Sequence, residues 1–392
     1  MTDVYLVAAR RTPIGRYGGA LSAVRPDDMA AHVIDAVHDA TGHQAVDEVV
    51  FGCANQAGED NRNVARMAVL LSRLPETVPA LTVNRLCASG LDAVIAGARA
   101  IRDGGAEVVI AGGVESMSRA PFVMAKAETA FARTTEVHDT TIGWRFVNRA
   151  IERQYGIESM PETAENVAAE TGIARADQDA FALRSQTRYD AAWHAADIAP
   201  VTIRGRKGDT VVDRDEHPRA TTLAALAALP TPFRAGGTVT AGNASGVNDG
   251  AAAVLLASGS AVKRHGWTPL ARLGAAASAG VPPRIMGIGP VAACERLAAR
   301  TGLRPADMDA IELNEAFAAQ ALACTRAWGL ADDDPRVNAF GGAIAMGHPL
   351  GMSGARIAAT AARRLAEGGG QHALATLCVG VGQGVALLLH RP

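Results

Sequence analysis

The chain has 392 residues, which is long enough for two domains with substantial cores. Hydrophobic residues make up 48% and charged residues 20%, the composition of an ordinary globular protein. The formal net charge of -2 argues against general binding to nucleic acids or to membrane surfaces. An anionic small-molecule ligand would therefore need a local group of basic residues.

The five cysteines lie far apart, and none belongs to a C-x-x-C pair. The sequence therefore predicts neither a metal site nor a disulfide framework. Residues 1–7 lack a basic segment followed by an apolar one, so they resemble a first strand and not a signal peptide. No apolar run reaches the length of a membrane span. We expect a cytoplasmic protein.

Short apolar runs alternate with helical segments along the chain, which predicts an α/β fold. In the first half we expect strands at 4–7, 48–52, 81–86 and 108–112, and helices at 26–43 and 91–101. In the second half we expect a strand at 310–313, helices at 315–328 and 354–365, and a hairpin of 373–378 and 385–390.

The two halves share a short pattern. A Val-Asn pair, a Ser-Gly pair, a helix, a run of glycines and a strand follow in this order from Val83, and again from Val337. The second copy contains an insertion that ends near His348, so the equivalent loops carry Cys87 and His348. If the halves pack about a pseudo-twofold axis, these loops meet. The alternative is a chance recurrence of Ser-Gly before a helix.

Residues 119–247 interrupt this pattern. The segment is more polar, has charged runs at 204–209 and 213–219, and contains two predicted surface helices at 163–170 and 177–194. We interpret it as a lid or loop domain inserted in the first half, with basic residues for a nucleotide phosphate. For most of these charges, a solvated surface is the better explanation.

Cys87 lies where a predicted strand ends and a predicted helix begins. A helix N-terminus favours negative charge, so we expect this position to favour the thiolate, the form that attacks carbonyl carbon. A buried structural cysteine is the alternative for any single position, but it would more commonly lie within a strand or on an apolar helix face.

Three distant segments carry further candidate groups. His348 lies in a glycine-rich loop and can activate a thiol or donate to an oxyanion, although a lone histidine is more often a packing residue. Cys378 ends a predicted strand and suits proton transfer at carbon, and the turn at Gly380 suits a backbone oxyanion hole. Asn314, at a strand-to-helix corner, can cap the helix, hold a water or orient a catalytic group.

Together these segments resemble the thiolase family from end to end. The matching blocks are 11–15 (RTPIG), 87–90 (CASG), 112–118 (GGVESMS), 237–250 (GTVTAGNASGVNDG), 314–317 (NEAF), 341–351 (GGAIAMGHPLG) and 377–380 (LCVG). Segments 16–21, 53–66, 139–148 and 159–167 resemble the 3-oxoadipyl-CoA (β-ketoadipyl-CoA) thiolases more narrowly. Ser159 stands where the acetoacetyl-CoA branch usually has a histidine.

The resemblance implies a thiolase fold of two pseudo-twofold-related α/β halves in five layers, α-β-α-β-α. The implied division is an N-terminal half at 1–118 with 248–268, an inserted lid that binds coenzyme A at 119–247, and a C-terminal half at 269–392. It also implies a homodimer or homotetramer, no permanently bound cofactor, and coenzyme A as co-substrate.

The implied reaction is the ping-pong cleavage of 3-oxoadipyl-CoA by CoA to succinyl-CoA and acetyl-CoA, in the catabolism of aromatic compounds. Cys87 would be the nucleophile and carry the acyl thioester, His348 would activate it, and Cys378 would be the general acid and base. The N–H groups of Cys87 and Gly380 would form one oxyanion site. His348 and a water on Asn314 would form the other.

The same resemblance implies contacts with coenzyme A: Ser245 with the pantetheine, Arg219 with the adenine nucleotide, and Met160, Phe233 and Phe317 as apolar walls. A closed site must neutralise the distal carboxylate of the substrate or leave it in water. Arg145 is our candidate partner, because it is a cation in a subfamily-specific segment.

Several alternatives remain. Another thiolase, acting on acetoacetyl-CoA or straight-chain 3-ketoacyl-CoA, is the nearest. A ketoacyl-synthase-type enzyme pairs one cysteine with two histidines or with histidine and asparagine, so the thiol of Cys378 argues against it. A non-catalytic CoA-binding scaffold has no need of all four candidate side chains. A Rossmann dehydrogenase is suggested by the G-x-G-x-x-A pattern at 287–292, but we discount it because the pattern contains a proline and follows no clear strand. An α/β-hydrolase is not expected, because no G-x-S-x-G motif occurs.

Overall fold

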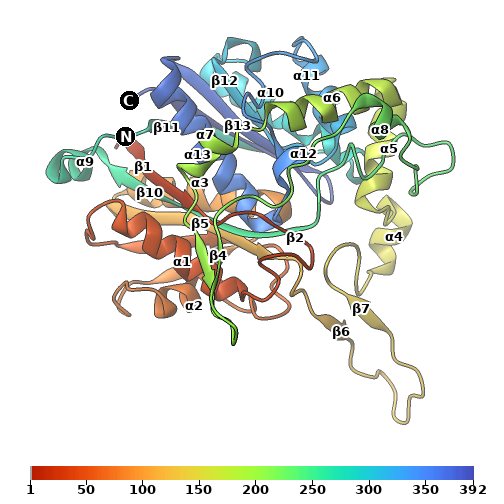
Figure 1. Ribbon diagram of the computed structural model, residues 1–392, viewed down its shortest axis with the longest axis horizontal. Coiled ribbons are helices and arrows are strands. Elements are labelled where there is room, and N and C mark those ends of the chain that lie inside the picture. The colour runs from red at the N-terminus through yellow and green to blue at the C-terminus, as the bar shows by residue number, and fades with distance from the viewer. Residues whose placement is uncertain (1) are drawn as a thin grey trace.

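The computed structural model of the protein describes residues 2–392, and its strands and helices are stacked in layers (Figure 1). Ten strands form one large mixed sheet in the order β12-β13-β14-β11-β1-β10-β5-β3-β4, with β2 paired to β10. Their bounds are β1 Val4–Arg11, β2 Gly15–Arg16, β3 Glu48–Gly52, β4 Ala80–Val83, β5 Val108–Ser116, β10 Asn248–Ser258, β11 Ala271–Gly280, β12 Ala310–Leu313, β13 His372–Val379 and β14 Gln383–His390.

The sheet consists of two halves with the same strand order. β1, β10, β5 and β3 follow one another in the first half with antiparallel, antiparallel and parallel pairing. β11, β14, β13 and β12 repeat this order and these directions in the second half. The halves are joined only where Tyr5 and Leu6 of β1 pair with β11. Val83 pairs beside β3 and Val337 bridges beside β12, which confirms the predicted repeat.

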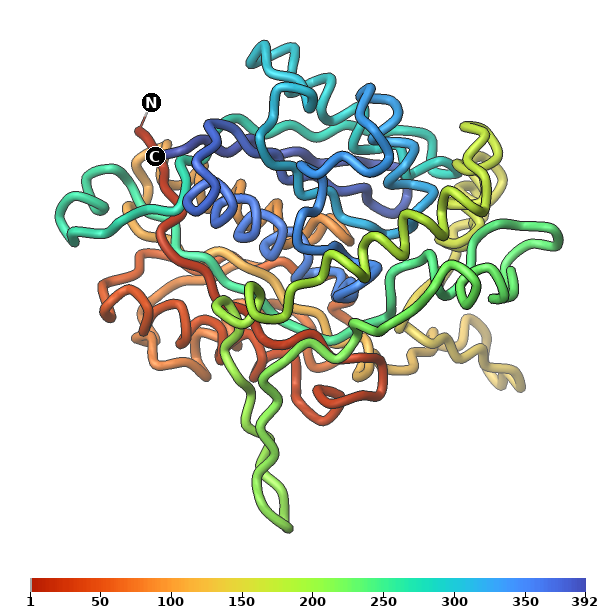
Figure 2. The backbone as a smooth tube through the Cα atoms, turned by 45° about the horizontal axis from the view of Figure 1, so that its top comes forward, coloured from red at the N-terminus to blue at the C-terminus, as the bar shows by residue number. Residues whose placement is uncertain are grey.

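Helices form three further layers (Figure 2). α1 (Pro26–Asp39) and α2 (Val64–Leu71) pack on the outer side of the first half. α10 (Gly289–Thr301) and α11 (Ala318–Ala327) pack on the outer side of the second half. α3 (Ser89–Asp103) and α13 (Leu350–Gly368) lie between the halves. The result is the five-layer α-β-α-β-α order that the resemblance implied.

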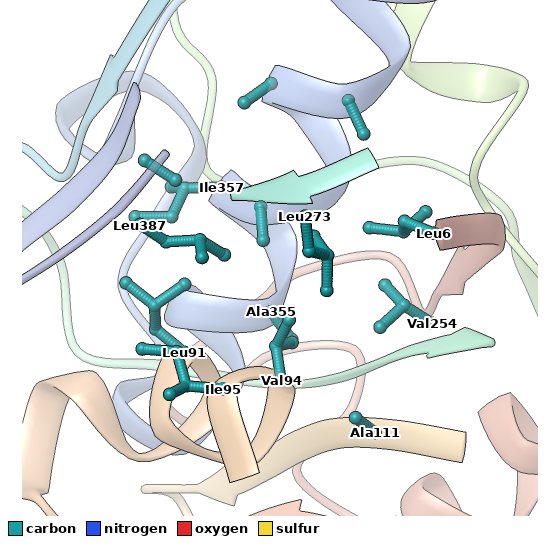
Figure 3. Close-up of a cluster of buried hydrophobic side chains, with 14 of the residues drawn as sticks. Leu6, Leu91, Val94, Ile95, Ala111, Val254, Leu273, Ala355, Ile357 and Leu387 are labelled. Carbon is teal, nitrogen blue, oxygen red and sulfur yellow. The ribbon is translucent and has the colours of Figure 1, made fainter. Parts of the chain in front are cut away.

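Successive side chains along a strand point to opposite faces of the sheet, so each strand packs against a helical layer on both sides. In β5, Val109 and Ala111 face the central helices, whereas Val108 and Ile110 face α1 and α2. Figure 3 shows the central cluster, where leucine, isoleucine and valine side chains of α3 meet residues of α13 and of strands from both halves. One continuous core therefore ties the halves together.

The two central helices approach so closely that glycine is required between them. A Cβ on Gly354 of α13 would lie 2.1 Å from the backbone N of Leu91. A Cβ on Gly90 of α3 would lie 2.5 Å from the carbonyl O of Gly351. Neither distance is sterically allowed. The equivalent Ser-Gly pairs of the repeat thus bring the N-terminal ends of both helices together.

The remaining elements lie at the periphery or in the connections. They are β6 Phe122–Met124, β7 Val137–Asp139, α4 Arg149–Tyr155, α5 Met160–Thr171, α6 Arg175–Arg188, α7 Ala191–Ala195, β8 Val201–Ile203, β9 Thr210–Val212, α8 Leu223–Ala227, α9 Gly259–His265 and α12 Ala343–Met346, with short 3-10 turns η1 Leu86–Ala88, η2 Pro283–Ile288 and η3 Pro305–Asp307. Every strand within the described residues 119–247 lies outside the large sheet. The three-part division predicted for the chain stays a prediction.

Several boundaries differ from the prediction. α11 begins at Ala318 and not at residue 315, because the backbone of Phe317 is extended and bridges to Ala244. α13 begins at Leu350, four residues early. α5 is not a surface helix, because its residues from Thr163 to Ala168 are buried. Among the helices of residues 2–392, none combines the length and the apolar character that crossing a bilayer requires.

Gly354→Ala should destabilise the protein by about 3 kcal/mol or more, because the new methyl group forces two packed backbones apart. Gly368→Ala is the matched control, since it lies on the same helix and a Cβ there meets no atom within 4 Å. The midpoint of thermal unfolding measures both. An unchanged midpoint for Gly354→Ala would contradict the close contact of α3 and α13.

Candidate active site

A cavity of about 490 Å³ opens beside Cys87. Part of its wall comes from the two halves, through Leu86, Cys87, Glu115 and Gly380. The rest comes from the inserted segment, through residues 140–146 and 158–160. A thiol at the wall of a largely apolar cavity is a suitable position for a nucleophile acting on a bound acyl group.

The turn before Cys87 is strained and well supported. Leu86 has a φ of 46°, which is uncommon for a residue with a side chain. Its N–H donates to Asn84 Oδ1 at 2.9 Å, and Ser89 Oγ donates to its carbonyl at 2.7 Å. These bonds hold the turn against its strain, so Cys87 has a fixed position directly before α3.

The thiol of Cys87 is not acidified. Burial raises its pKa to about 11, although backbone N–H groups of Gly380 and of Cys87 itself act in the opposite direction. The expectation that the helix N-terminus would favour the thiolate is therefore wrong for this structure, because desolvation of the charge outweighs the helix. The N–H of Gly380 nevertheless lies beside the sulfur, where an oxyanion donor is needed.

His348 lies between α12 and α13, and its tautomer follows from its contacts. Its Nδ1 is 2.6 Å from Ser353 Oγ, which donates its own hydrogen to the carbonyl of Pro349 at 2.8 Å. Ser353 must therefore accept, so Nδ1 carries the hydrogen. Asn314 Nδ2 donates to Nε2 at 3.3 Å. Nε2 thus offers a lone pair, as a general base requires.

Burial, and the nearby charge of Arg356, lower the pKa of His348 to about 3. The imidazole is therefore neutral at physiological pH. Its backbone N–H donates to Asn248 Oδ1 at 2.9 Å, which fixes the loop from the side of β10. The thiol of Cys87 and the imidazole of His348 are consequently both neutral in the resting protein.

Asn314 and Cys378 lie deeper. The backbone N–H of Asn314 donates to Thr376 of β13 at 3.0 Å, which places Asn314 beside the strand of Cys378. Asn314 Oδ1 is buried and has no hydrogen-bond partner among residues 2–392, which suits a group that holds a water. Burial, and then the neighbouring thiol of Cys87, raise the pKa of Cys378 well above its usual value.

The five residues predicted to contact coenzyme A lie at different distances from the cavity beside Cys87. Met160 lines the cavity, and Phe317 packs in one cluster with Met160 and Cys378. Ser245 is held through its N–H to Ala316 at 2.9 Å. Ser245, Phe317, Arg219 and Phe233 are not among the residues that line the cavity. Arg219 donates to Ala241 at 3.2 Å, and Phe233 is 40% exposed.

Sequence reasoning missed two supporting residues. Ser353, which orients His348, occupies the same place in the repeat as Ser89, which supports the turn at Cys87, so the repeat itself held the signal. Glu115 is buried in the cavity wall and accepts N–H groups of Ala54, Asn55 and Gly351 at 2.9, 3.1 and 2.8 Å. It thereby links the first half to the start of α13, and burial raises its pKa to about 7.

Cys53, Asp60 and Glu115 place three potential metal ligands within 4.8 Å of one another. Asp60 already accepts the N–H groups of Gln56 and Gly58 at 3.1 and 2.9 Å, and Glu115 accepts three others. Because these donors occupy the oxygens that a cation would need, the cluster is better explained as a buried hydrogen-bond network.

Comparison with known proteins shows the family of the chain. The family described as "Thiolase, N-terminal domain" matches residues 4–260, and "Thiolase, C-terminal domain" matches residues 267–391. The chain therefore belongs to the thiolase family.

Three individual proteins within the family are similar to this chain. A curated protein of Pseudomonas aeruginosa named "Beta-ketoadipyl-CoA thiolase" is 61% identical over 99% of both chains. An "Acetyl-CoA acetyltransferase" of Syntrophomonas wolfei is 43% identical over 99% of this chain and 98% of its own. The crystal structure of human mitochondrial 3-ketoacyl-CoA thiolase in complex with CoA has a TM-score of 0.90 and 40% identity, covering 100% of this chain and 98% of that one.

Alkylation of Cys87 by iodoacetamide should accelerate about tenfold per pH unit from pH 7 towards pH 10, because a thiol with a raised pKa forms thiolate only as the pH rises. The modified peptide can be quantified by mass spectrometry. The other four cysteines are buried and should react slowly. A rate constant that is already level at pH 7 would indicate a thiolate–imidazolium pair and contradict the neutral state.

Proposed function

We propose that this thiolase cleaves 3-oxoadipyl-CoA with CoA to give succinyl-CoA and acetyl-CoA, in the breakdown of aromatic compounds. The observation that carries the proposal is the meeting of Cys87 and the N–H of Gly380 at one cavity, with the buried pair of His348 and Asn314 behind it. The relative at 61% identity named for beta-ketoadipyl-CoA supports the choice of substrate.

The first step forms the acyl-enzyme. His348 Nε2 takes the proton of Cys87, and the thiolate attacks the C3 carbonyl of the substrate. Negative charge moves to the carbonyl oxygen, to which the N–H groups of Cys87 and Gly380 donate hydrogen bonds. One such donor commonly contributes about 10²–10³ in rate.

Collapse of this adduct breaks the C2–C3 bond. The electron pair passes to the acetyl-CoA enolate, whose oxygen receives hydrogen bonds from protonated His348 and from a water on Asn314. Cys378 gives its proton to C2. A thiol whose pKa is raised is well suited to this role, since it stays protonated until the carbanion forms.

The second half-reaction restores the enzyme. The thiolate of Cys378 takes the proton of an incoming CoA thiol, and the CoA sulfur attacks the thioester on Cys87. Succinyl-CoA leaves, and the released thiolate of Cys87 recovers the proton held by His348. At the end of the cycle Cys87, His348 and Cys378 have regained their starting protonation states. Coenzyme A serves as co-substrate, and the proposed cycle uses no permanently bound cofactor.

We also propose that coenzyme A lies against the inserted segment, in contact with Ser245, Arg219, Met160, Phe233 and Phe317. The human relative, at 40% identity, was crystallised in complex with CoA, which supports coenzyme A as the ligand. We further propose a cytoplasmic homodimer or homotetramer. β4 is an edge strand. Its Leu81 is 38% exposed, and Leu70 and Leu71 of α2 are 51% and 53% exposed, which suits burial against a second copy.

CoA-dependent turnover of 3-oxoadipyl-CoA, compared with acetoacetyl-CoA, tests the substrate. We expect a large preference for 3-oxoadipyl-CoA in kcat/KM, and loss of activity on both in Cys87→Ser, because the hydroxyl is a far weaker nucleophile. A preference for acetoacetyl-CoA would retain the chemistry and reject the substrate. Absence of turnover with either would reject the proposed reaction.

Ser353→Ala should lower kcat on the order of 10-fold to 100-fold with little change in KM, because His348 loses the acceptor that fixes its tautomer. Ser353→Thr keeps the hydroxyl and should recover part of the rate. Steady-state kinetics and a thermal unfolding midpoint, measured together, separate this effect from a loss of fold. Equal rates for Ser353→Ala and the wild type would remove Ser353 from this role.

A further inference from the structure

Arg145 is the one cationic side chain among the described residues that line the cavity. It lies in the irregular segment between β7 and α4, on the same cavity wall as Trp144 and Phe146. The side chain is half-buried, so its charge is partly withdrawn from water. A lone cation in a largely apolar cavity requires either a partner in the protein or one on the ligand.

The protein supplies only neutral partners. Arg145 Nη2 donates to Asn55 Oδ1 at 2.9 Å and approaches the carbonyl of Asn55 at 3.5 Å. Asn55 is itself oriented, because its Nδ2 donates to Thr140 Oγ1 at 3.1 Å and its backbone N–H to Glu115 at 3.1 Å. Within residues 2–392, the guanidinium makes no salt bridge, and Nε and Nη1 make no hydrogen bond. The cation is thus positioned but not neutralised.

The carboxylates of the cavity wall are engaged elsewhere. Glu115 accepts three backbone N–H groups, as described above, and Glu158 accepts Asn166 Nδ2 at 2.9 Å. Neither lies within salt-bridge distance of Arg145 among the described residues. The guanidinium therefore keeps free donors for an anion that enters the cavity.

We propose that Arg145 binds the distal carboxylate of the acyl chain and is the residue that selects a dicarboxylic substrate. The inference rests on the proposed function. During the reaction the acyl group on Cys87 is a four-carbon succinyl chain that ends in a carboxylate. Cys87 and Arg145 line one cavity, so the thioester at one end and the ion pair at the other would fix the chain between them. A chain that ends in a methyl group leaves the cation without a partner.

Two substrates of equal chain length test this proposal. 3-Oxoadipyl-CoA and 3-oxohexanoyl-CoA share six acyl carbons and differ in a carboxylate against a methyl group. Arg145→Ala should lower kcat/KM for 3-oxoadipyl-CoA on the order of 10²-fold, because truncating one partner of a buried charge pair leaves the other unpaired. Turnover of 3-oxohexanoyl-CoA should stay the same or rise.

Arg145→Gln provides a second variant, since its amide can still donate to Asn55 while the charge is lost. It should show the same loss of selectivity even if Arg145→Ala folds poorly. Arg149→Ala is the matched control. Arg149 lies four residues further on, is 77% exposed at its side chain, and pairs with Glu152 at 2.7 Å, so both activities should be unchanged.

The outcomes separate the two proposals. Wild-type protein that turns over 3-oxohexanoyl-CoA but not 3-oxoadipyl-CoA would overturn the proposed function and this inference with it. A second outcome is that the wild type turns over 3-oxoadipyl-CoA normally, while Arg145→Ala and Arg145→Gln lose activity equally on both substrates. Arg145 would then be a structural residue of the lid, and the assignment would be overturned. Unchanged kinetics in both variants would likewise overturn the assignment to Arg145 and leave the reaction intact.

Discussion

The close contact of α3 and α13 is the constraint on which the rest of the structure depends. Glycine at positions 90 and 354 lets the two backbones touch, so the turn of Cys87 and the loop of His348 meet although they are far apart in the chain. Glu115 reinforces the contact, because it accepts N–H groups both from the end of β3 and from Gly351 in the first turn of α13. The proposed catalytic groups come from two different halves, so their geometry is precise only if the halves have one relative position. Backbone contact between α3 and α13 leaves little freedom for that position to change.

Burial controls the charges of the site more than local dipoles do. It raises the pKa values of Cys87 and Cys378 and lowers that of His348, so the resting groups are neutral. A neutral site avoids the cost of desolvated charges between turnovers. Charge then develops only when an acyl-CoA is present, and the N–H of Gly380 is already positioned beside the reacting sulfur. In the proposed reaction, hydrogen bonds of this kind would form with charge that develops only in the transition state, which is the requirement for catalysis.

Much of this was accessible from the sequence. The α/β fold class, the internal repeat and the position of Cys87 before a helix follow from apolar periodicity and from the recurrence of Val-Asn and Ser-Gly. The five-layer arrangement followed only from the resemblance to the thiolases. The state of the thiol did not follow, because burial by residues distant in sequence outweighs the helix terminus that a local pattern reveals. The late start of α11 after Phe317 and the burial of α5 also depend on tertiary contacts. Ser353 and Glu115 act through neighbours, and a linear pattern does not display such contacts.

The cavity separates the chemistry from the choice of substrate. Cys87, Gly380, Asn314 and His348 come from the ends of strands and helices in the two packed halves, where a substitution would disturb the core. Residues 140–146 form the opposite kind of wall: they lie in a segment without regular structure, and Ile142, Arg145 and Phe146 are only partly buried. A substitution there costs little stability, so under the proposed function the acyl preference can change while the proposed catalytic groups stay in place. The 43% identity to an acetyl-CoA acetyltransferase, over nearly the whole of both chains, is consistent with one reaction framework on which different cavity walls select different acyl groups.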